Sequence, residues 1–235
     1  MSRILFVTGT DTAVGKTTVT ALLLAHALTR EGPVRALKPL SSGDRGDEAI
    51  FRELQGASEI NFAHFDLPLA PWSVARRAGD QLGKEPLLEW LLQQSQKCEL
   101  LLVEGAGGLL SPLGERFTAL DLIEQLRAEV VVVARNRLGV LNQVLLVLAA
   151  LASRPPMETR IALIAEKEPD FSARTNYEDL IELVRPIEVI RLSYLNDLKP
   201  NAESFRAAAA KLDDALALLL GKKNPPDTEP RGFFP

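Results

Sequence analysis

Short runs of β-branched and other apolar residues recur along the chain without alternating with polar residues. Runs of this kind are typical of strands that are buried on both faces, as in a parallel sheet. Between them, apolar residues recur at the three- and four-residue spacing of helices that pack one face against a sheet. The expected strands are 3–8, 34–37, 99–104, 129–134, 160–165 and 187–192, and the expected helices are 16–30, 47–55, 84–96, 119–127, 140–152, 177–185 and 202–220.

This alternation of strands and helices predicts the fold class. Repeated units of strand, crossing helix and parallel strand build a sheet with helices on both faces. We therefore expect one α/β domain over residues 1–222, doubly wound around a mainly parallel sheet, and a disordered proline-rich tail at 223–235. Ligands in such folds bind beyond the carboxyl ends of the strands. The loops at that edge are 9–17, 38–47, 104–114, 135–142 and 165–170.

Composition narrows the possible partners. The 235 residues are 46% apolar and 25% charged, an ordinary globular balance, and the net charge of −4 gives no basic field for nucleic acid or an anionic membrane. The longest apolar run, 144–152, is too short to span a bilayer.

Cys98 is the only cysteine, and the first residues do not form a signal-peptide pattern, so we expect a cytoplasmic protein. His26 and His64, the only histidines, exclude a histidine-rich metal site and are expected to be structural or surface residues.

The loop after the first expected strand has the parts of a phosphate-binding loop. Glycines at positions 9 and 15 let the backbone turn, and the amides of residues 13–18 would converge on an anion at the start of a helix. Lys16 supplies a point charge for the β- and γ-phosphates, and the Thr17 hydroxyl supplies a ligand for Mg²⁺. Five residues separate the two glycines instead of the usual four, which indicates a variant of this loop.

The second loop, LKPLSSGDRGDEAI at 37–50, follows the next expected strand. Lys38 ends that strand, because Pro39 cannot continue its hydrogen bonds. Asp47 lies where a helix could begin, and its carboxylate could bind Mg²⁺ directly or through water. By itself the segment fits a polar turn with an N-capping aspartate equally well. Its position beside the phosphate loop favours a functional role.

The third loop, VEGAGGLLSPL, begins at the end of a strongly apolar strand. Glu104 stands at the strand end, as the acidic Mg²⁺ residue of a second nucleotide-binding motif does. Gly105, Gly107 and Gly108 would let the backbone approach a ligand closely. The alternative is an acidic surface residue that merely ends a strand.

The segments GTDTAVGKT, KPLSSG and VEGAGGLLSPL, in this order and at these strand ends, resemble the motifs of the dethiobiotin synthetases, a phosphate-loop NTPase-like family. That family has the longer loop with five residues between its glycines. The segment RLGVLNQ at 137–143 also resembles the glycine-asparagine segment with which the family opens a helix. The resemblance covers about residues 1–200.

The resemblance implies an ATP-dependent carboxylation and ring closure in biotin biosynthesis. In the family, CO₂ adds to one amine of 7,8-diaminopelargonic acid as a carbamate, and ATP phosphorylates the carbamate. The second amine then closes the ring of dethiobiotin and releases phosphate. Such a reaction requires Mg²⁺, charge neutralisation and alignment of the reacting groups more than covalent chemistry by the protein.

The resemblance also implies roles for single residues. Lys16 and Lys38 would hold the γ-phosphate and the carbamate, and Thr12 would lie near the reacting groups. The implied metal ligands are Thr17, Asp47 and Glu104. The implied nucleotide-binding residues are Ala13, Val14, Gly15, Lys16, Thr17 and Thr18 in the first loop and Glu104, Gly105, Ala106 and Gly107 in the third.

On the substrate side, Ser42 corresponds to the family's serine. The family places the diamine substrate at the interface of a homodimer, where the start of a helix in the second chain holds its carboxylate. The residues implied there are Gly139, Val140 and Asn142. A helix N-terminus suits a carboxylate on physical grounds as well.

Two positions depart from the family pattern where the base is expected. Ala165, followed by Glu166, stands in place of an asparagine that reads adenine, and Arg191 stands in place of a proline near the base. The phosphate and metal groups are intact. The sequence therefore predicts an enzyme that tolerates different nucleotide bases.

Two other functions fit parts of the pattern. A cobyrinate-type amide synthetase would usually add a glutamine-hydrolysing domain with a nucleophilic cysteine, for which this chain has no room. A partitioning-type ATPase switch would carry a signature lysine where this chain has Thr10, and would favour a basic or amphipathic surface. Both alternatives are weaker than the synthetase.

Overall fold

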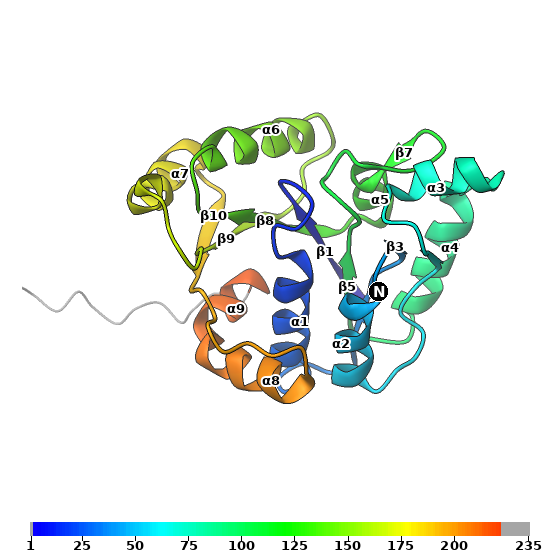
Figure 1. The fold of residues 1–235 in the computed structure, drawn as a ribbon, viewed down its shortest axis with the longest axis horizontal. Helices are drawn as coiled ribbons and strands as arrows, with labels where there is room; N and C mark the ends of the chain where they lie inside the picture. The colour runs from blue at the N-terminus through cyan, green and yellow to red at the C-terminus, as the bar shows by residue number, and fades with distance from the viewer. Residues whose placement is uncertain (1, 222–235) are drawn as a thin grey trace, which may run out of the picture.

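The computed structural model describes residues 2–221, which form a central six-stranded sheet with helices on both sides (Figure 1). All neighbouring strands of this sheet run parallel, in the order β10–β9–β8–β1–β5–β2. The expected doubly wound α/β fold is confirmed. The six strands are β1 Arg3–Gly9, β2 Val34–Leu37, β5 Leu100–Glu104, β8 Glu129–Arg135, β9 Thr159–Ile164 and β10 Glu188–Leu192.

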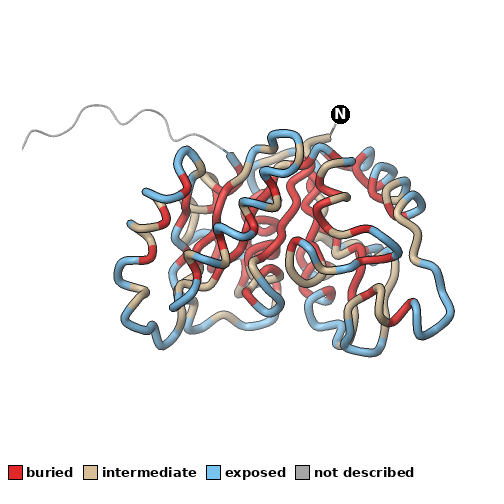
Figure 2. The backbone as a smooth tube through the Cα atoms, turned by 90° about the horizontal axis from the view of Figure 1, so that it is seen from above, coloured by how far each residue is buried: buried red, intermediate tan, exposed pale blue. Residues whose placement is uncertain are grey.

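Two apolar cores lie on opposite faces of the sheet, and Figure 2 shows the buried strands running between them. In β1, Ile4 and Phe6 pack into one core, while Leu5 and Val7 pack into the other. Burial on both faces explains why the strands read as continuous apolar runs. One core is covered by α4 Lys84–Ser95, α5 Ala119–Leu126, α6 Val140–Ala152 and α7 Asn176–Val184, and the other by α1 Lys16–Ala27, α2 Gly46–Gln55, α8 Ala202–Lys211 and α9 Asp213–Leu219.

The structure differs from the sequence prediction in several short elements. The helix expected over 202–220 is divided into α8 and α9 at Leu212. The elements that the sequence did not predict are α3 Pro71–Ala78, the strand pairs β3 Leu40–Ser42 with β4 Ala63–Phe65 and β6 Pro112–Gly114 with β7 Phe117–Thr118, and the 3₁₀ helix η1 Phe171–Arg174. The tail expected at 223–235 lies outside the described residues.

Cys98, His26 and His64, the residues singled out by composition, all have covered side chains. Cys98 is a free thiol in the apolar core, and the His26 and His64 side chains are almost completely covered. Across residues 2–221, no helix combines the length and the apolar character needed to cross a membrane.

Candidate active site

Three loops meet at the carboxyl edge of the sheet, where β1, β5 and β2 lie side by side. Together they surround a cavity of about 400 Å³, the phosphate cavity. Val14 does not line it; its side chain packs against the apolar core and lines a neighbouring cavity. The expected site residues that line this cavity are Thr12, Ala13, Gly15, Lys16, Thr17, Thr18, Lys38, Ser42, Asp47, Glu104, Gly105, Ala106 and Gly107.

The loop between β1 and α1 depends on its two glycines. Gly15 has a φ of 99°, and a Cβ there would lie 2.8 Å from the Ile164 side chain. At Gly9 a Cβ would lie 2.6 Å from the Val14 side chain. Ala13 also has a positive φ, 56°, a conformation that non-glycine residues adopt at a cost. The first turn of α1 has neither a side-chain cap nor an acidic residue, so its N–H groups suit an anion.

Lys16 lies over this loop with its side chain largely buried. It is 7% exposed, and its Nζ donates to the Asp11 carbonyl at 2.9 Å. Burial lowers the pKa of Lys16, since an ammonium in this position has lost much of its hydration. An anionic group in the cavity would stabilise the Lys16 ammonium in place of the lost water. A phosphate ligand would supply such a group.

A carboxylate cluster forms the floor of the phosphate cavity. Glu104 is only 1% exposed, and its Oε1 accepts hydrogen bonds from Thr17 Oγ1 at 2.8 Å and from Lys38 Nζ at 3.0 Å. Lys38 also contacts Asp47. Burial alone would lower the pKa of Lys38, but the carboxylates of Glu104 and Asp47 outweigh it and raise that pKa. Lys38 is therefore held in its charged form.

These residues offer a donor set that suits Mg²⁺. Glu104 Oε2 is buried and has no hydrogen-bond partner, an arrangement that normally costs free energy. Burial raises the pKa of Glu104, so a further cation nearby would favour its ionised form. Together with the Asp47 carboxylate and the Thr17 hydroxyl, this oxygen provides the hard ligands that Mg²⁺ prefers.

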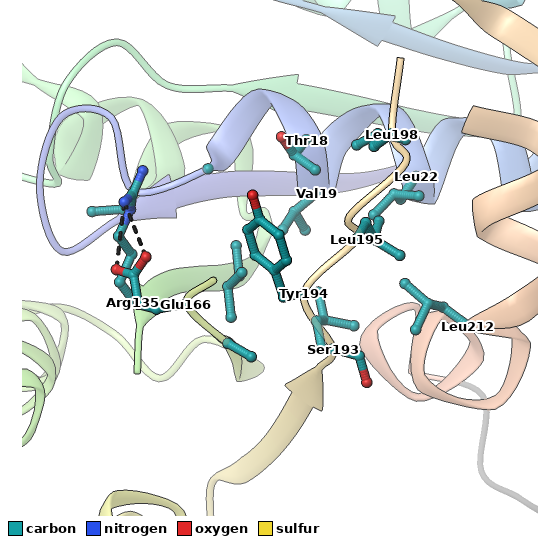
Figure 3. A pocket seen from close by; sticks show the side chains of 15 residues that line it. Thr18, Val19, Leu22, Arg135, Glu166, Ser193, Tyr194, Leu195, Leu198 and Leu212 are labelled. Carbon is teal, nitrogen blue, oxygen red and sulfur yellow. Dashed lines mark hydrogen bonds and ion pairs between the residues drawn. The ribbon is translucent and has the colours of Figure 1, made fainter. Parts of the chain in front are cut away.

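A second cavity of about 290 Å³, the nucleoside cavity, adjoins the first beyond the ends of β9 and β10 (Figure 3). The two cavities share Gly15, Thr18 and Arg135 in their walls. Ala165 lines the nucleoside cavity, as the sequence suggested for the base region. The walls are mostly apolar and include Leu22, Ile164, Leu192, Tyr194, Leu195 and Leu198.

Arg191 does not line this cavity, contrary to the expectation from the sequence. Its guanidinium lies 4.0 Å from the centre of the Tyr177 ring of α7, on the other face of the sheet. Side chains alternate between the faces of a strand, so the neighbouring Leu192 points to the cavity instead. Ser193 and Tyr194, just after β10, occupy the region where Arg191 was expected.

Comparison with known proteins assigns the family. The model of the AAA domain family AAA_26 matches residues 3–202. The chain is 39% identical over 193 residues to the ATP-dependent dethiobiotin synthetase of Mycobacterium avium, covering 80% of this chain and 85% of that one. This chain belongs to the dethiobiotin synthetase family. The synthetase of Anaeromyxobacter sp. is 34% identical over 88% of this chain and 97% of its own length.

The fold is shared more widely than this family. The ParA family ATPase of Chlorobium tepidum superposes with a TM-score of 0.57, covering 93% of this chain and 98% of that one, at 12% sequence identity. A likeness at such low identity shows the fold alone. The relatives found by sequence are dethiobiotin synthetases, so they separate this chain from the partitioning-type switches that its architecture resembles.

A buried polar network behind the dethiobiotin synthetase motifs was missed by sequence reasoning. Glu48 of α2 is completely buried and accepts a hydrogen bond from Ser41. His64 Nδ1 lies 2.8 Å from Ser41 Oγ and 3.1 Å from Glu48 Oε1, and Arg52 Nη2 lies 3.1 Å from Glu48 Oε2. Asn61 Nδ2 joins the network at Ser41 Oγ, 3.2 Å away.

This network adjoins three expected site residues. Ser41 directly precedes Ser42, and Glu48 directly follows Asp47. Asn61 Nδ2 also donates to the Lys38 carbonyl at 2.7 Å. Burial would raise the pKa of Glu48, but hydrogen bonds from its partners lower it below the ordinary value, so this carboxylate is ionised. The network therefore holds the KPLSSG segment against α2 and β4.

The expected residues at the start of α6 lie apart from both cavities. Gly139 and Asn142 are exposed, whereas the Val140 side chain is buried in the core. Gly139 has a φ of 94° and begins the helix without a side-chain cap. These residues do not contribute to the phosphate cavity of their own chain.

Proposed function

We propose that this protein is a dethiobiotin synthetase that uses ATP, Mg²⁺ and CO₂ to convert 7,8-diaminopelargonate into dethiobiotin, ADP and phosphate. The observation that carries the proposal is the meeting of the phosphate loop, Lys38 and the carboxylates of Asp47 and Glu104 around one cavity. ATP as the co-substrate also fits a cytoplasmic enzyme.

The reaction divides into three balanced steps. One amine adds to CO₂ and loses a proton, giving a carbamate. A carbamate oxygen then attacks the γ-phosphorus of ATP, and ADP leaves as the bond to the β-γ bridging oxygen breaks. The second amine finally attacks the carbamate carbon, loses a proton and expels inorganic phosphate, which closes the five-membered ureido ring.

The residues of the phosphate cavity suit the second step. Lys16 and Lys38 bring two positive charges to a largely buried site, where charges interact more strongly than in water. Because its pKa is raised, Lys38 acts as a fixed cation and hydrogen-bond donor, not as a base. Thr17, Asp47 and Glu104 would hold Mg²⁺, which would neutralise charge on the β- and γ-phosphates. Ser42 would donate to the carbamate.

A homodimer would complete the substrate site. We propose that Gly139, Val140 and Asn142 at the start of α6 bind the carboxylate of a diamine held mainly by the other chain, since they line neither cavity of their own chain. The neighbouring Leu138, Leu145 and Leu146 are exposed apolar side chains, 79%, 39% and 63% respectively. Burying them between two chains would remove this apolar surface from water.

The proposed activity can be tested by phosphate release. Purified protein with MgATP is expected to release phosphate only when 7,8-diaminopelargonate and bicarbonate are both present, and mass spectrometry is expected to find dethiobiotin in equal amount. Corrinoid, DNA and lipid vesicles serve as controls for the two alternative functions. Phosphate release that ignores the diamine, or that depends on one of the controls, would contradict the proposal.

A further inference from the structure

Arg135 lies at the junction of the two cavities. It is the last residue of β8, and its side chain belongs to the walls of both the phosphate cavity and the nucleoside cavity. Lys16, Lys38 and Glu104 line only the phosphate cavity. Suppose that a nucleotide places its terminal phosphates beside these residues and its base in the nucleoside cavity. The phosphate next to the ribose would then lie beside Arg135.

The contacts of Arg135 orient its guanidinium at this junction (Figure 3). Nη2 donates to the Ala13 carbonyl of the phosphate loop at 2.7 Å. Nη1 lies 3.3 and 3.4 Å from the two carboxylate oxygens of Glu166. A guanidinium has five N–H groups, so these contacts leave donors for a ligand. The side chain is 39% exposed, which leaves it accessible from the cavities.

The junction offers one cationic donor group to a ligand. Among the residues that line the nucleoside cavity, Arg135 is the one cation and Glu166 the one carboxylate. Lys38 lines only the phosphate cavity, where it pairs with Asp47 and Glu104. Within the described part of the chain, no lysine and no second arginine line the nucleoside cavity. Arg135 is thus the charged donor available to a phosphate beside the ribose.

We propose that Arg135 is a nucleotide-binding residue whose guanidinium contacts the α-phosphate of ATP and ADP, with Glu166 as its orienting partner. This inference rests on the proposed function for the identity of the ligand. Charge-assisted hydrogen bonds from arginine to phosphate are among the stronger polar contacts in proteins. The contact is independent of the base, so it contributes affinity that the apolar walls around Ala165 do not supply.

Binding of MgADP and MgATP to the full chain, measured by titration calorimetry without diamine, tests this assignment. R135Q keeps a shorter polar side chain and removes the charge, and we expect it to weaken both nucleotides by the same factor, about tenfold to a hundredfold. R135K, which restores the charge without the planar fork, is expected to recover part of that loss.

Two further variants separate phosphate binding from simple bracing of the loop. E166Q keeps one acceptor oxygen that can orient Arg135 Nη1 and removes a negative charge, so it is expected to bind both nucleotides at least as tightly as the unaltered protein. R191Q is the matched control, because Arg191 lies near the same strands but outside both cavities. Its affinities are expected to stay unchanged.

Several results would overturn the assignment. Unchanged affinities in R135Q would remove Arg135 from the site, and a loss confined to ATP would move its contact to the γ-phosphate. A loss of nucleotide affinity in E166Q as large as that in R135Q would show that the Arg135–Glu166 pair only stabilises the phosphate loop. If instead the nucleotides behave as expected but no dethiobiotin forms, the proposed function fails and the binding role of Arg135 stands.

Discussion

Lys16 and Lys38 have different electrostatic environments, although both are largely buried at the phosphate cavity. Lys16 has a backbone carbonyl as its hydrogen-bond partner and a lowered pKa, whereas Lys38 lies between two carboxylates and has a raised pKa. Lys16 is thus poised to gain an anionic partner. Lys38 must share its charge between the carboxylates and the reacting groups.

Replacing either lysine by alanine is expected to lower kcat about a hundredfold or more, the size of effect seen when a charge that stabilises a transition state is removed. Initial rates of dethiobiotin formation at saturating substrates measure the loss. Lys97→Ala is the control, because Lys97 is about half exposed and pairs with Glu59 at the surface. A Lys38→Ala variant with near-normal kcat would exclude Lys38 from the mechanism.

Glu48 allows a test of the buried network. Glu48→Ala removes the carboxylate that joins Ser41, His64 and Arg52, and we expect the free energy of unfolding to fall by about 3–5 kcal/mol. Urea denaturation measures this change. The exposed Glu53 of the same helix is the control, and Glu53→Ala is expected to alter stability by less than about 0.5 kcal/mol. Equal stability of the two variants would show that the network contributes little.

At the scale of elements, the loops after β9 and β10 form the wall against which a base in the nucleoside cavity would lie. Their loops supply Ala165 and Tyr194 to the nucleoside cavity, and the Glu166 carboxylate is paired with Arg135. An alanine side chain can pack against a purine but cannot pair with its polar edge. The phosphate loop, by contrast, holds groups that every nucleoside triphosphate carries.

We therefore expect broad nucleotide use. GTP, CTP and UTP should each support dethiobiotin formation with kcat/KM within about tenfold of ATP, because losing one matched polar pair forfeits about 1–3 kcal/mol of discrimination. Rates at saturating diaminopelargonate measure the four values. A preference for ATP above about a hundredfold would reveal a specific reader of adenine, for instance backbone groups of the loop after β10.

The accuracy of the sequence prediction follows from how each element is buried. All six central strands were predicted, since burial on both faces produces unbroken apolar runs such as Val130–Val133. The strand pairs β3–β4 and β6–β7 are too short to produce a periodic pattern. The α8–α9 segment is rich in alanine and leucine throughout, and no glycine or proline marks the break at Leu212.

The site residues likewise divide into those that a local sequence pattern predicts and those that it does not. Motif residues next to glycines and strand ends were predicted, and the structure brings most of them to one cavity. The contact of His64 with Glu48 joins residues on separate elements, and no local pattern distinguishes a buried polar residue from a solvated one. Arg191 was misplaced because successive side chains of β10 point to opposite faces of the sheet, and the sequence alone does not show which face Arg191 takes.

At the scale of the whole molecule, the proposed substrate contact of α6 with a second chain would make activity depend on assembly. If Asn142 serves the neighbouring chain, Asn142→Ala is expected to weaken diaminopelargonate binding and leave nucleotide binding intact. Neither Asn142→Ala nor Lys16→Ala dimers would then hold a fully intact site. Equal mixing of the two is expected to restore up to about a quarter of the activity, because half of the dimers are hybrids with one intact site of two.

Activity after mixing, with subunit exchange confirmed by differently tagged chains, measures this effect. An analytical ultracentrifuge run on each variant is the control for assembly. Absence of recovery in mixtures that do exchange would place the whole substrate site within one chain.

The strand order also shapes the way this chain can fold as it leaves the ribosome. β1 lies in the interior of the sheet, where Arg3 pairs with Leu100 and Leu5 pairs with Glu129. β1 therefore waits for two partners encoded far downstream, and contacts of such large sequence separation slow folding. During this interval the apolar β1 and the glycine-rich turn after it have no sheet to join. Exposed apolar strands of this kind favour aggregation until their partners have formed.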